Sequence, residues 1–241
     1  AFPEPAGIMP VDAGVQRFLA VSVLINATIM AFAVIYLLTR QVARAEARLE
    51  AEHARSEALL RNLLPESIAA QLKTRPGRVI AEGLPAVTLL FADIVDFTPR
   101  SARMSPEDLV SFLNRIFSEF DAMSEARGLE KIKTIGDAYM VAAGLPAARA
   151  DHAEVVADMA LDMQAAAARL GREMGDAVSL RIGIHTGPAV AGVIGTSKVF
   201  YDVWGDTVNT ASRMESHGEP GRIQVTSATR DQALRKPGRP S

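Results

Sequence analysis

An α/β domain preceded by one membrane helix is the fold that the sequence predicts. Three features lead to it: a long uncharged apolar segment near the N-terminus, a charged segment without Gly or Pro after it, and alternating strand-like and helix-like segments from residue 87 onward. Of the 241 residues, 49% are apolar and 22% charged, as in proteins with a buried core. The net charge of −2 and the lack of cysteine argue against a nucleic-acid partner, disulfides and thiolate chemistry.

Residues 18–38 are predicted to cross a membrane, which makes lipid an expected partner. The segment has 21 residues and no formal charge, and a helix of about 20 residues spans the roughly 30 Å hydrocarbon core of a bilayer. Only Arg17 precedes it, whereas Arg40 and Arg44 follow, so the positive-inside rule puts residues 1–17 outside the cell membrane and the later residues in the cytoplasm. A signal peptide, with a shorter apolar stretch, and a buried core helix are the alternatives.

Residues 39–73 are predicted to form stalk helices. The stretch from Arg40 to Asn62 contains neither Gly nor Pro and is rich in Ala, Arg, Glu and Leu, which favours one continuous helix. A loose heptad with a polar middle predicts a weak parallel two-helix stalk, with a solvated spacer helix as the alternative. The helix restarts after Leu63, where Pro65 fits a first turn. Residues 74–86 contain two Pro and two Gly, which is typical of a linker.

Residues 87–241 carry the alternating pattern of the predicted α/β domain. Apolar periodicity predicts strands over 87–94, 177–185 and 223–226, a strand hairpin over 129–143, and helices over 106–126, 150–174 and 206–216. The Gly-rich stretch 187–195 is interpreted as a turn followed by an interface hairpin, in which glycine is needed for close backbone approach. This order predicts an α/β sandwich with helices packed on one face of a sheet.

Two acids interrupt apolar runs at the ends of predicted strands. Asp93 ends the first strand, and Asp137 sits at the turn of the hairpin. If these strands are neighbours, the two carboxylates converge and offer the hard oxygen ligands that Mg²⁺ or Mn²⁺ requires. Turn capping by each Asp separately is the alternative.

Four blocks of sequence, FADIVDFT, KIKTIGDAYM, RIGIHTGPAVAGVIG and YDVWGDTVNTASRMES, resemble in order and spacing the catalytic domain of class III nucleotide cyclases. The preceding LLPESIAAQLK resembles the short element before that domain, so the resemblance covers roughly residues 63–226. It implies a ferredoxin-like α/β sandwich and a phosphorus–oxygen lyase that forms a cyclic nucleotide and pyrophosphate.

The resemblance also implies which residues form the site. They are a metal group of Asp93, Ile94 and Asp137, a purine-reading pair of Lys133 and Asp202, and a catalytic pair of Asn209 and Arg213. Two Mg²⁺ or Mn²⁺ ions per site are the implied cofactors, because a metal pair lowers the pKa of the ribose 3′-hydroxyl and neutralises the triphosphate. Arg213 would donate forked hydrogen bonds to phosphoryl oxygens where charge accumulates.

The purine-reading pair favours ATP as substrate. Lys133 can only donate and ionised Asp202 can only accept, which matches the N1 acceptor and amino donor of adenine. Guanine presents the opposite order, and family members that act on GTP typically carry a Glu and a small polar residue here. The sequence therefore predicts an adenylate cyclase. A guanylate or mixed-specificity cyclase and a catalytically silent membrane receptor module are the alternatives; a diguanylate cyclase is disfavoured because no GG[DE]EF motif occurs.

A homodimer is expected from the spacing of the site residues. Lys133 and Asp137 lie four residues apart across a tight hairpin, too close for one chain to bind both the purine and the metal-bound triphosphate. In the family the metal acids come from one subunit, whereas the purine-reading and catalytic pairs come from the other. We therefore expect contacts through both the catalytic domain and the stalk, with two equivalent sites per dimer.

The sequence departs from the family pattern at two places. Asp96 stands where most family members have Gly, which puts a third acid near the metal group. The chain ends without the family's last strands and their phosphate-binding lysine, so Lys236 receives no role and reduced activity is expected. Because the chain begins with Ala1 rather than Met, we expect it to be part of a longer protein.

Overall fold

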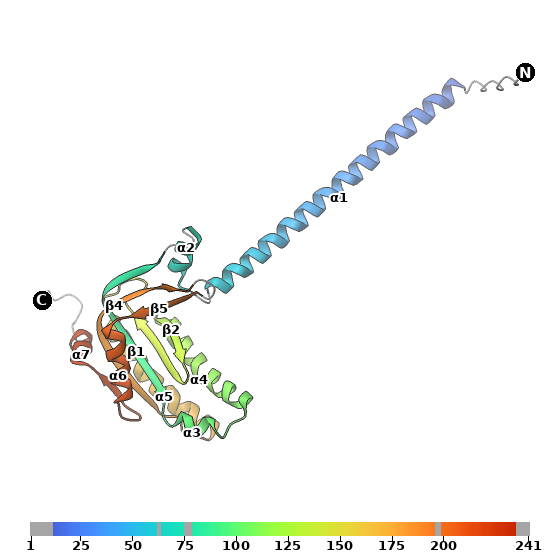
Figure 1. The fold of residues 1–241 in the computed structure, drawn as a ribbon. Coiled ribbons are helices and arrows are strands. Elements are labelled where there is room, and N and C mark those ends of the chain that lie inside the picture. Colours follow the sequence, from blue (N-terminus) through green and yellow to red (C-terminus); the bar gives the residue numbers. More distant parts are fainter. Residues whose placement is uncertain (1–11, 62–63, 75–78, 196–198, 235–241) are drawn as a thin grey trace, which may run out of the picture. The chain divides into compact units, whose positions relative to one another are not determined.

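The computed structural model of the chain describes residues 12–61, 64–74, 79–195 and 199–234, so the C-terminal stretch with Lys236 lies outside the described residues. The chain divides into two compact units, residues 1–60 and 61–241. Figure 1 shows the elements in order: α1 (Ala13–Arg61), α2 (Glu66–Thr74), β1 (Ala81–Ile94), α3 (Phe97–Ser101), α4 (Pro106–Ala126), β2 (Glu130–Ile135), β3 (Ala138–Ala143), α5 (His152–Met174), β4 (Leu180–Ile194), β5 (Phe200–Trp204), α6 (Asp206–Ser216), β6 (Ile223–Val225) and α7 (Ser227–Ala233).

The first unit is the single helix α1, which runs through the predicted membrane segment and on into the predicted stalk. It is long and apolar enough to cross a membrane, with a mean hydropathy of 2.4 over its most apolar 18-residue window and none of that window buried. The amide of Asn26 donates to the backbone oxygen of Ser22, 2.8 Å away, so this polar group is satisfied within its own helix. The guanidinium of Arg40 lies 5.2 Å from the ring centroid of Tyr36, a cation–π contact where the apolar segment ends.

The second unit contains one mixed sheet with the strand order β2-β3-β1-β4-β5, in which β6 pairs parallel to β4. Apart from the five-residue helix α3, its first four strands and the helices between them follow the order β1-α4-β2-β3-α5-β4, and the pairs β1–β3, β1–β4 and β2–β3 are antiparallel. This arrangement confirms the predicted ferredoxin-like sandwich.

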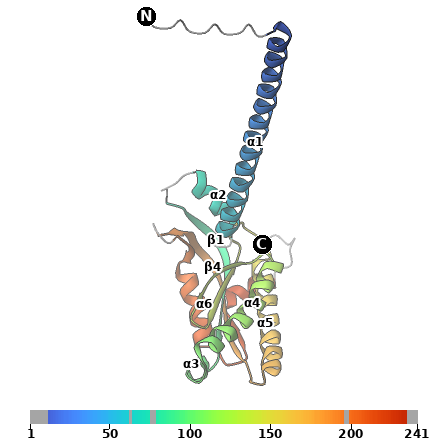
Figure 2. The same ribbon diagram turned by 90° about the vertical axis from the view of Figure 1, so that its right-hand side faces the viewer.

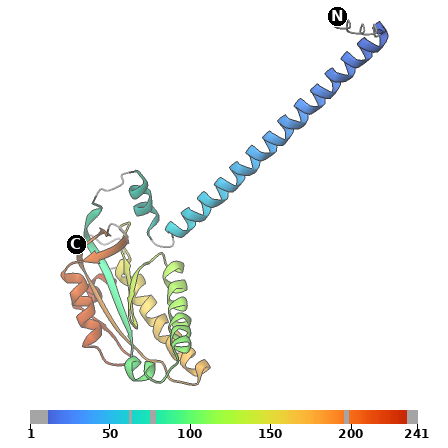
Figure 3. The ribbon, with the colours of Figure 1, turned by 45° about the vertical axis from the view of Figure 1, so that its right-hand side comes forward.

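Helices cover both faces of this sheet, which corrects the expectation that they pack on one face only. Helices α4 and α5 lie on one side and α6 on the other (Figures 2 and 3). The alternation of β4 explains this: Ile182 and Ile184 face the main core, whereas Gly183 between them is in contact with the backbone of Glu215 in α6.

The main core forms between the sheet and helices α4 and α5. Ser105 caps α4 by accepting a hydrogen bond from the backbone N–H of Asp108, and Pro106 occupies the first turn. Apolar side chains at helical spacing then turn inward. Fully buried members of the core include Leu90, Ile116, Phe120, Tyr139, Met159, Met163 and Ile182. Burial of each such side chain contributes about 1.5–3 kcal/mol, which fixes the strand ends that carry the polar residues described below.

Two predicted boundaries were wrong because main-chain pairing extends beyond the apolar runs. Strand β1 begins at Ala81, so residues 81–86 of the predicted linker are strand, paired in part with residues 189–192 of β4. Strand β4 continues to Ile194, so the turn expected at the start of residues 187–195 is strand, whereas the expected hairpin is present as the antiparallel pair of β4 and β5. The glycines of β4 permit close backbone approach: a Cβ at Gly192 would lie 2.4 Å from the carbonyl oxygen of Ile80. The short elements α3, β5 and α7 were not predicted.

Candidate active site

Asp93 and Asp137 meet at one edge of the sheet. Strands β1 and β3 pair antiparallel with Ala92 opposite Tyr139, so the last residues of β1 lie beside the turn between β2 and β3. Burial raises the pKa of the Asp93 carboxyl from 3.8 to about 7, and the negative charge and hydrogen bond of Asp137 are the next causes. The edge therefore concentrates negative charge that a cation would relieve.

The donor set at this edge fits a divalent metal ion. Two carboxylates supply hard oxygen atoms and leave coordination positions for water and phosphate oxygens. Ile94 is 2% exposed as a residue and its side chain is apolar, so only its backbone carbonyl oxygen could be a metal ligand. Among the residues that the structure describes, no group of three or more His, Asp or Glu side chains is arranged around one metal position.

A cation and a further acid, which sequence reasoning missed, complete this edge. Arg181 of β4 lies opposite Asp93 in the β1–β4 register, and its Nη2 donates to Oδ2 of Asp93 over 3.0 Å. Its Nε donates to Oε1 of Glu215, 2.7 Å away in the last turn of α6. Arg181 interrupts an apolar strand as Asp93 does, and that signal was available in RIGIH.

Lys133 and Asp202, the predicted purine-reading pair, are brought together by the fold. The Nζ of Lys133 lies 2.5 Å from Oδ2 of Asp202. The other carboxylate oxygen of Asp202 accepts a hydrogen bond from the backbone N–H of Val203 at 2.9 Å, which fixes the orientation of the carboxylate. The Lys133 side chain is 42% exposed and that of Asp202 16%, so the pair lies at a surface where a ligand can reach it.

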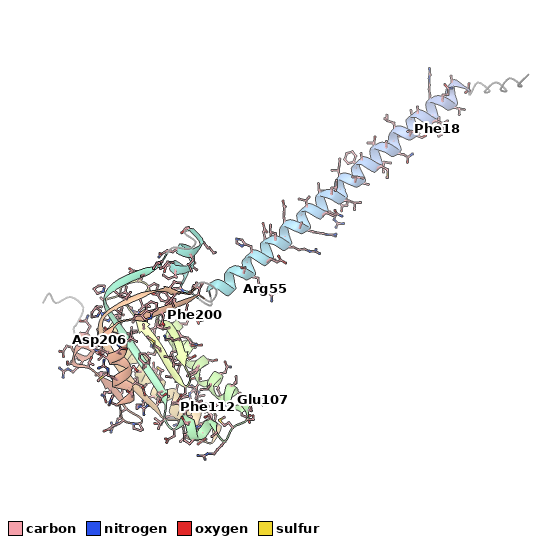
Figure 4. The ribbon with its side chains drawn as sticks, viewed as in Figure 1. Phe18, Arg55, Glu107, Phe112, Phe200 and Asp206 are labelled. Atoms are coloured by element: carbon pink, nitrogen blue, oxygen red, sulfur yellow. The ribbon has the colours of Figure 1, made fainter. Side chains whose placement is uncertain are left out.

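Asn209 and Arg213 lie one turn apart on an exposed face of α6. The Nε of Arg213 donates to the backbone oxygen of Asn209 at 3.2 Å, and its Nη2 lies 3.5 Å from Oδ1 of Asp206. Figure 4 labels Asp206 at the start of this helix. The helix thus presents an amide and a guanidinium to solvent, and the ion pair of the guanidinium with Asp206 is long, at 3.5 Å.

Among the described residues, Asp96 does not form a metal-binding group of three with Asp93 and Asp137. Its backbone has φ 57°, in the left-handed region that glycine adopts readily, and its side chain makes no capping hydrogen bond to α3. Asp96 lines a cavity of about 650 Å³ between α3, α4 and the end of α5, together with Arg100, Arg103 and Phe112. Asp96 thus adopts a left-handed backbone, which suits the glycine that most family members have at this position, and it lines the cavity beside α3.

Three groups of site residues therefore exist in one chain. They are the acid edge (Asp93, Asp137, Arg181 and Glu215), the purine-reading pair (Lys133 and Asp202) and the α6 pair (Asn209 and Arg213). Within the described part of the chain, no hydrogen bond or ion pair joins one of these groups to another.

The chain is similar to known cyclases both in sequence and in structure. Residues 79–238 match the family model described as the adenylate and guanylate cyclase catalytic domain. An adenylate cyclase of Mycobacterium tuberculosis is 50% identical over 223 residues, which are 90% of this chain and 50% of the relative. This chain thus spans about half the length of the curated relatives that it matches first.

Two solved structures share the fold. The guanylate cyclase domain of RhGC from Catenaria anguillulae, in complex with GTP, is 37% identical with a TM-score of 0.61, covering 64% of this chain and 84% of that one. The adenylyl cyclase CyaB from P. aeruginosa is 28% identical with a TM-score of 0.61, covering 63% of this chain and 81% of that one.

Proposed function

Because the chain belongs to the family of adenylate and guanylate cyclase catalytic domains, we propose that it is a membrane-anchored adenylate cyclase that converts ATP to 3′,5′-cyclic AMP and pyrophosphate. The observation that supports ATP as the substrate is the 2.5 Å ion pair of Lys133 and Asp202, which puts a donor beside an acceptor in the order that adenine requires. The similarity to a mycobacterial adenylate cyclase supports the same reaction. The similarity to a GTP-bound guanylate cyclase domain makes a guanylate or mixed-specificity enzyme the competing candidate.

The acid edge is the proposed site of Mg²⁺ or Mn²⁺. Asp93, the backbone carbonyl of Ile94, and Asp137 would hold the ions, and the mutual repulsion of the two carboxylates favours cation binding. The chemistry that two such ions supply is a lower pKa for the ribose 3′-hydroxyl and neutralisation of the triphosphate charge.

The other residues bind and orient the nucleotide in this proposal. Lys133 donates to N1 of adenine, and Asp202 accepts from the exocyclic amino group. Asn209 positions the ribose through its side-chain amide. Arg213 donates to phosphoryl oxygens that gain charge as the 3′-oxygen attacks the α-phosphorus and pyrophosphate leaves.

We place two equivalent active sites across a homodimer. The acid edge and the other two groups of one chain share no hydrogen bond or ion pair within the described residues, so the acids of one subunit would work with the pairs of its partner. Exposed apolar side chains at the end of the sheet support a subunit contact there: Val190, Ile194, Phe200 and Trp204. Residues 18–38 would anchor each chain in the cell membrane, with residues 39–73 as a stalk and the catalytic domain in the cytoplasm.

Co-expression of two inactive variants tests this proposal. The full chain in membrane vesicles should form cyclic AMP from ATP with Mn²⁺, and neither Asp93→Ala nor Arg213→Ala should do so alone. Co-expression of both should restore roughly a quarter of the activity, because half of the dimers are mixed and each mixed dimer has one intact site.

The matched controls are Asp158→Ala and Arg222→Ala, which remove exposed charges outside the three groups and should leave turnover unchanged. A preference for GTP would overturn ATP as the substrate. Mixed dimers without activity would overturn the shared sites, and an inactive parent chain would favour the silent receptor module.

A further inference from the structure

Arg181 lies between carboxylates that come from different elements of the domain. Its Nη2 contacts Asp93 at the end of β1, and its Nε contacts Glu215 on α6, at 3.0 and 2.7 Å. Side-chain exposure is 28% for Arg181, 21% for Asp93 and only 10% for Glu215. These pairs are therefore more shielded from solvent than ordinary surface ion pairs, and removal of one member leaves a buried charge uncompensated.

The backbone of Glu215 is fixed against the sheet. A Cβ at Gly183 would lie 2.0 Å from the amide nitrogen of Glu215, so the last turn of α6 rests directly on the main chain of β4. The chain then turns over the stem of Arg181, because a Cβ at Gly218 would lie 3.1 Å from its Cγ. The Glu215 carboxylate therefore contacts Arg181 from a backbone that is held in place by its packing on β4.

The way in which Glu215 holds Arg181 decides what the guanidinium can do at the acid edge. A free guanidinium prefers to bind a carboxylate with two parallel hydrogen bonds, which would cover both oxygens of Asp93. With Nε engaged by Glu215, only Nη2 contacts Asp93, through Oδ2. Arg181 therefore leaves the second oxygen of Asp93 uncovered, and the carboxyl otherwise contacts Asp137, with which it would share a cation.

We propose that Glu215 is a positioning residue of the acid edge, which acts through Arg181 to keep Asp93 open to a divalent cation. The proposal rests on the proposed function, because it takes Asp93 as a metal ligand. Helix α6 then serves both active sites of the dimer. Its exposed face, with Asn209 and Arg213, completes the partner's site, whereas its last turn supports the acids of its own chain.

Binding of Mn²⁺ to the full chain without nucleotide, followed by electron paramagnetic resonance, tests the positioning role independently of turnover. Glu215→Ala should weaken Mn²⁺ binding about tenfold, the lower end of the usual loss when a residue that orients a metal ligand is removed. In an Arg181→Ala background the same substitution should have no further effect, because its route to Asp93 is gone. An undiminished loss in that background would show that only the charge of Glu215 matters and would overturn the proposal.

Glu215→Gln provides the conservative variant, and Glu219→Gln provides a matched control on an exposed residue beyond the end of α6. Thermal unfolding of each variant identifies those that fail to fold. If Glu215→Ala does not fold, Mn²⁺ binding is compared between Glu215→Gln and the parent chain. Gln keeps an oxygen that accepts from Nε of Arg181 but lacks the charge, so this variant should bind Mn²⁺ more weakly than the parent chain and more tightly than Glu215→Ala, whereas Glu219→Gln should bind as the parent does. Equal binding by both would overturn the proposal.

Mixed dimers distinguish the role of the last turn of α6 from the role of its exposed face. A dimer of Asp93→Ala and Arg213→Ala chains has one intact site, with its acids from the Arg213→Ala chain and its α6 pair from the Asp93→Ala chain. Glu215→Ala should reduce kcat about tenfold, and Glu215→Gln by less, on the chain that supplies the acids, and neither should have an effect on the other chain. Equal loss from either chain would overturn the proposal. A parent chain without cyclase activity would overturn the proposed function alone, since the Mn²⁺ measurement would still decide the role of Glu215.

Discussion

Lys133 and Asp202 form an ion pair of 2.5 Å although their strands, β2 and β5, stand at opposite ends of the strand order β2-β3-β1-β4-β5. A flat sheet of this order would separate them by four strand spacings of about 4.8 Å each. The two strands nevertheless contact each other, so the sheet curls until its edges meet. The purine-reading pair thus depends on the curvature of the whole sheet.

Exchange of this pair should change the purine that the enzyme selects. Lys133→Glu with Asp202→Ser presents an acceptor where guanine N1 donates and removes the charged acceptor that faces guanine O6. Each mispaired buried group costs about 1–3 kcal/mol, so the ratio of GTP to ATP turnover should rise at least tenfold. Yields of cyclic GMP and cyclic AMP with Mn²⁺ measure this ratio.

Lys131→Gln is the matched control for the exchange. Lys131 lies two residues away but pairs with Asp121 of α4, on the other face of the sheet, so its loss should leave the ratio unchanged. An active double variant that still prefers ATP would contradict the role given to Lys133 and Asp202.

The contact between Gly183 and α6 predicts a steric effect on stability. The Cβ of Gly183→Ala would lie 2.0 Å from the backbone nitrogen of Glu215, so α6 has to move away from β4. Such overpacking costs typically 1–3 kcal/mol, which lowers the Tm by several degrees in a domain of this size. Gly83→Ala is the control, because a Cβ there meets nothing within 4 Å. Equal Tm values for the two variants in detergent would show that α6 is not held at Gly183.

The convergence of Asp93 and Asp137 could be predicted from the sequence because both acids interrupt apolar runs and a tight hairpin fixes one of them beside a strand. The pairing of Arg181 with Glu215 could not, since the face of the sheet that α6 covers depends on which residue of β4 is glycine. Residues 187–195 were predicted only in part: the hairpin and the close backbone approach at glycine are present, but the expected turn is strand. Local sequence rules associate glycine with turns, whereas the pairing of β4 with β1 continues through it.

The partnership of Lys133 and Asp202 was inferred from family resemblance rather than from residue spacing. The strand that carries Asp202 has five residues and alternates apolar and polar side chains over too short a length to be recognised. The curvature that brings it to β2 is a property of the assembled sheet. Local patterns therefore predicted the convergence of the acids, whereas the family pattern predicted the pairing of Lys133 with Asp202.

Asp96→Gly should preserve or raise stability. The left-handed backbone of Asp96 carries a steric cost that Gly does not have, and its side chain makes no capping hydrogen bond whose loss would offset the gain. The expected gain is about 0–1 kcal/mol, visible as a small rise in Tm. Because Asp96 lines the cavity beside Arg103 and not the acid edge, the Mn²⁺ concentration for half-maximal activity should stay the same. A clear change in that concentration would place Asp96 in the metal group after all.

Glu130 gives the domain a pH-dependent stability. Burial raises the pKa of its carboxyl from 4.5 to about 7, and its charge also helps to raise the pKa of the nearby Tyr201 to about 12, where burial is the larger cause. Between pH 4.5 and about pH 7 the Glu130 carboxyl keeps its proton in the folded state, whereas the unfolded state has released it. The free energy of unfolding therefore falls as the pH rises from about 4.5 through 7, and the penalty is complete above 7.

Glu130→Gln should remove this penalty, because Gln resembles the neutral acid and never ionises. The variant and the parent chain should unfold at similar temperatures at pH 5, whereas at pH 8 the variant should be more stable by about 1–2 kcal/mol, after allowance for the partial exposure of Glu130. Thermal unfolding of both chains across this pH range measures the difference, with Glu125→Gln, an exposed residue of α4, as the control that should show none. A difference that does not grow with pH would mean that Glu130 already ionises freely in the folded state.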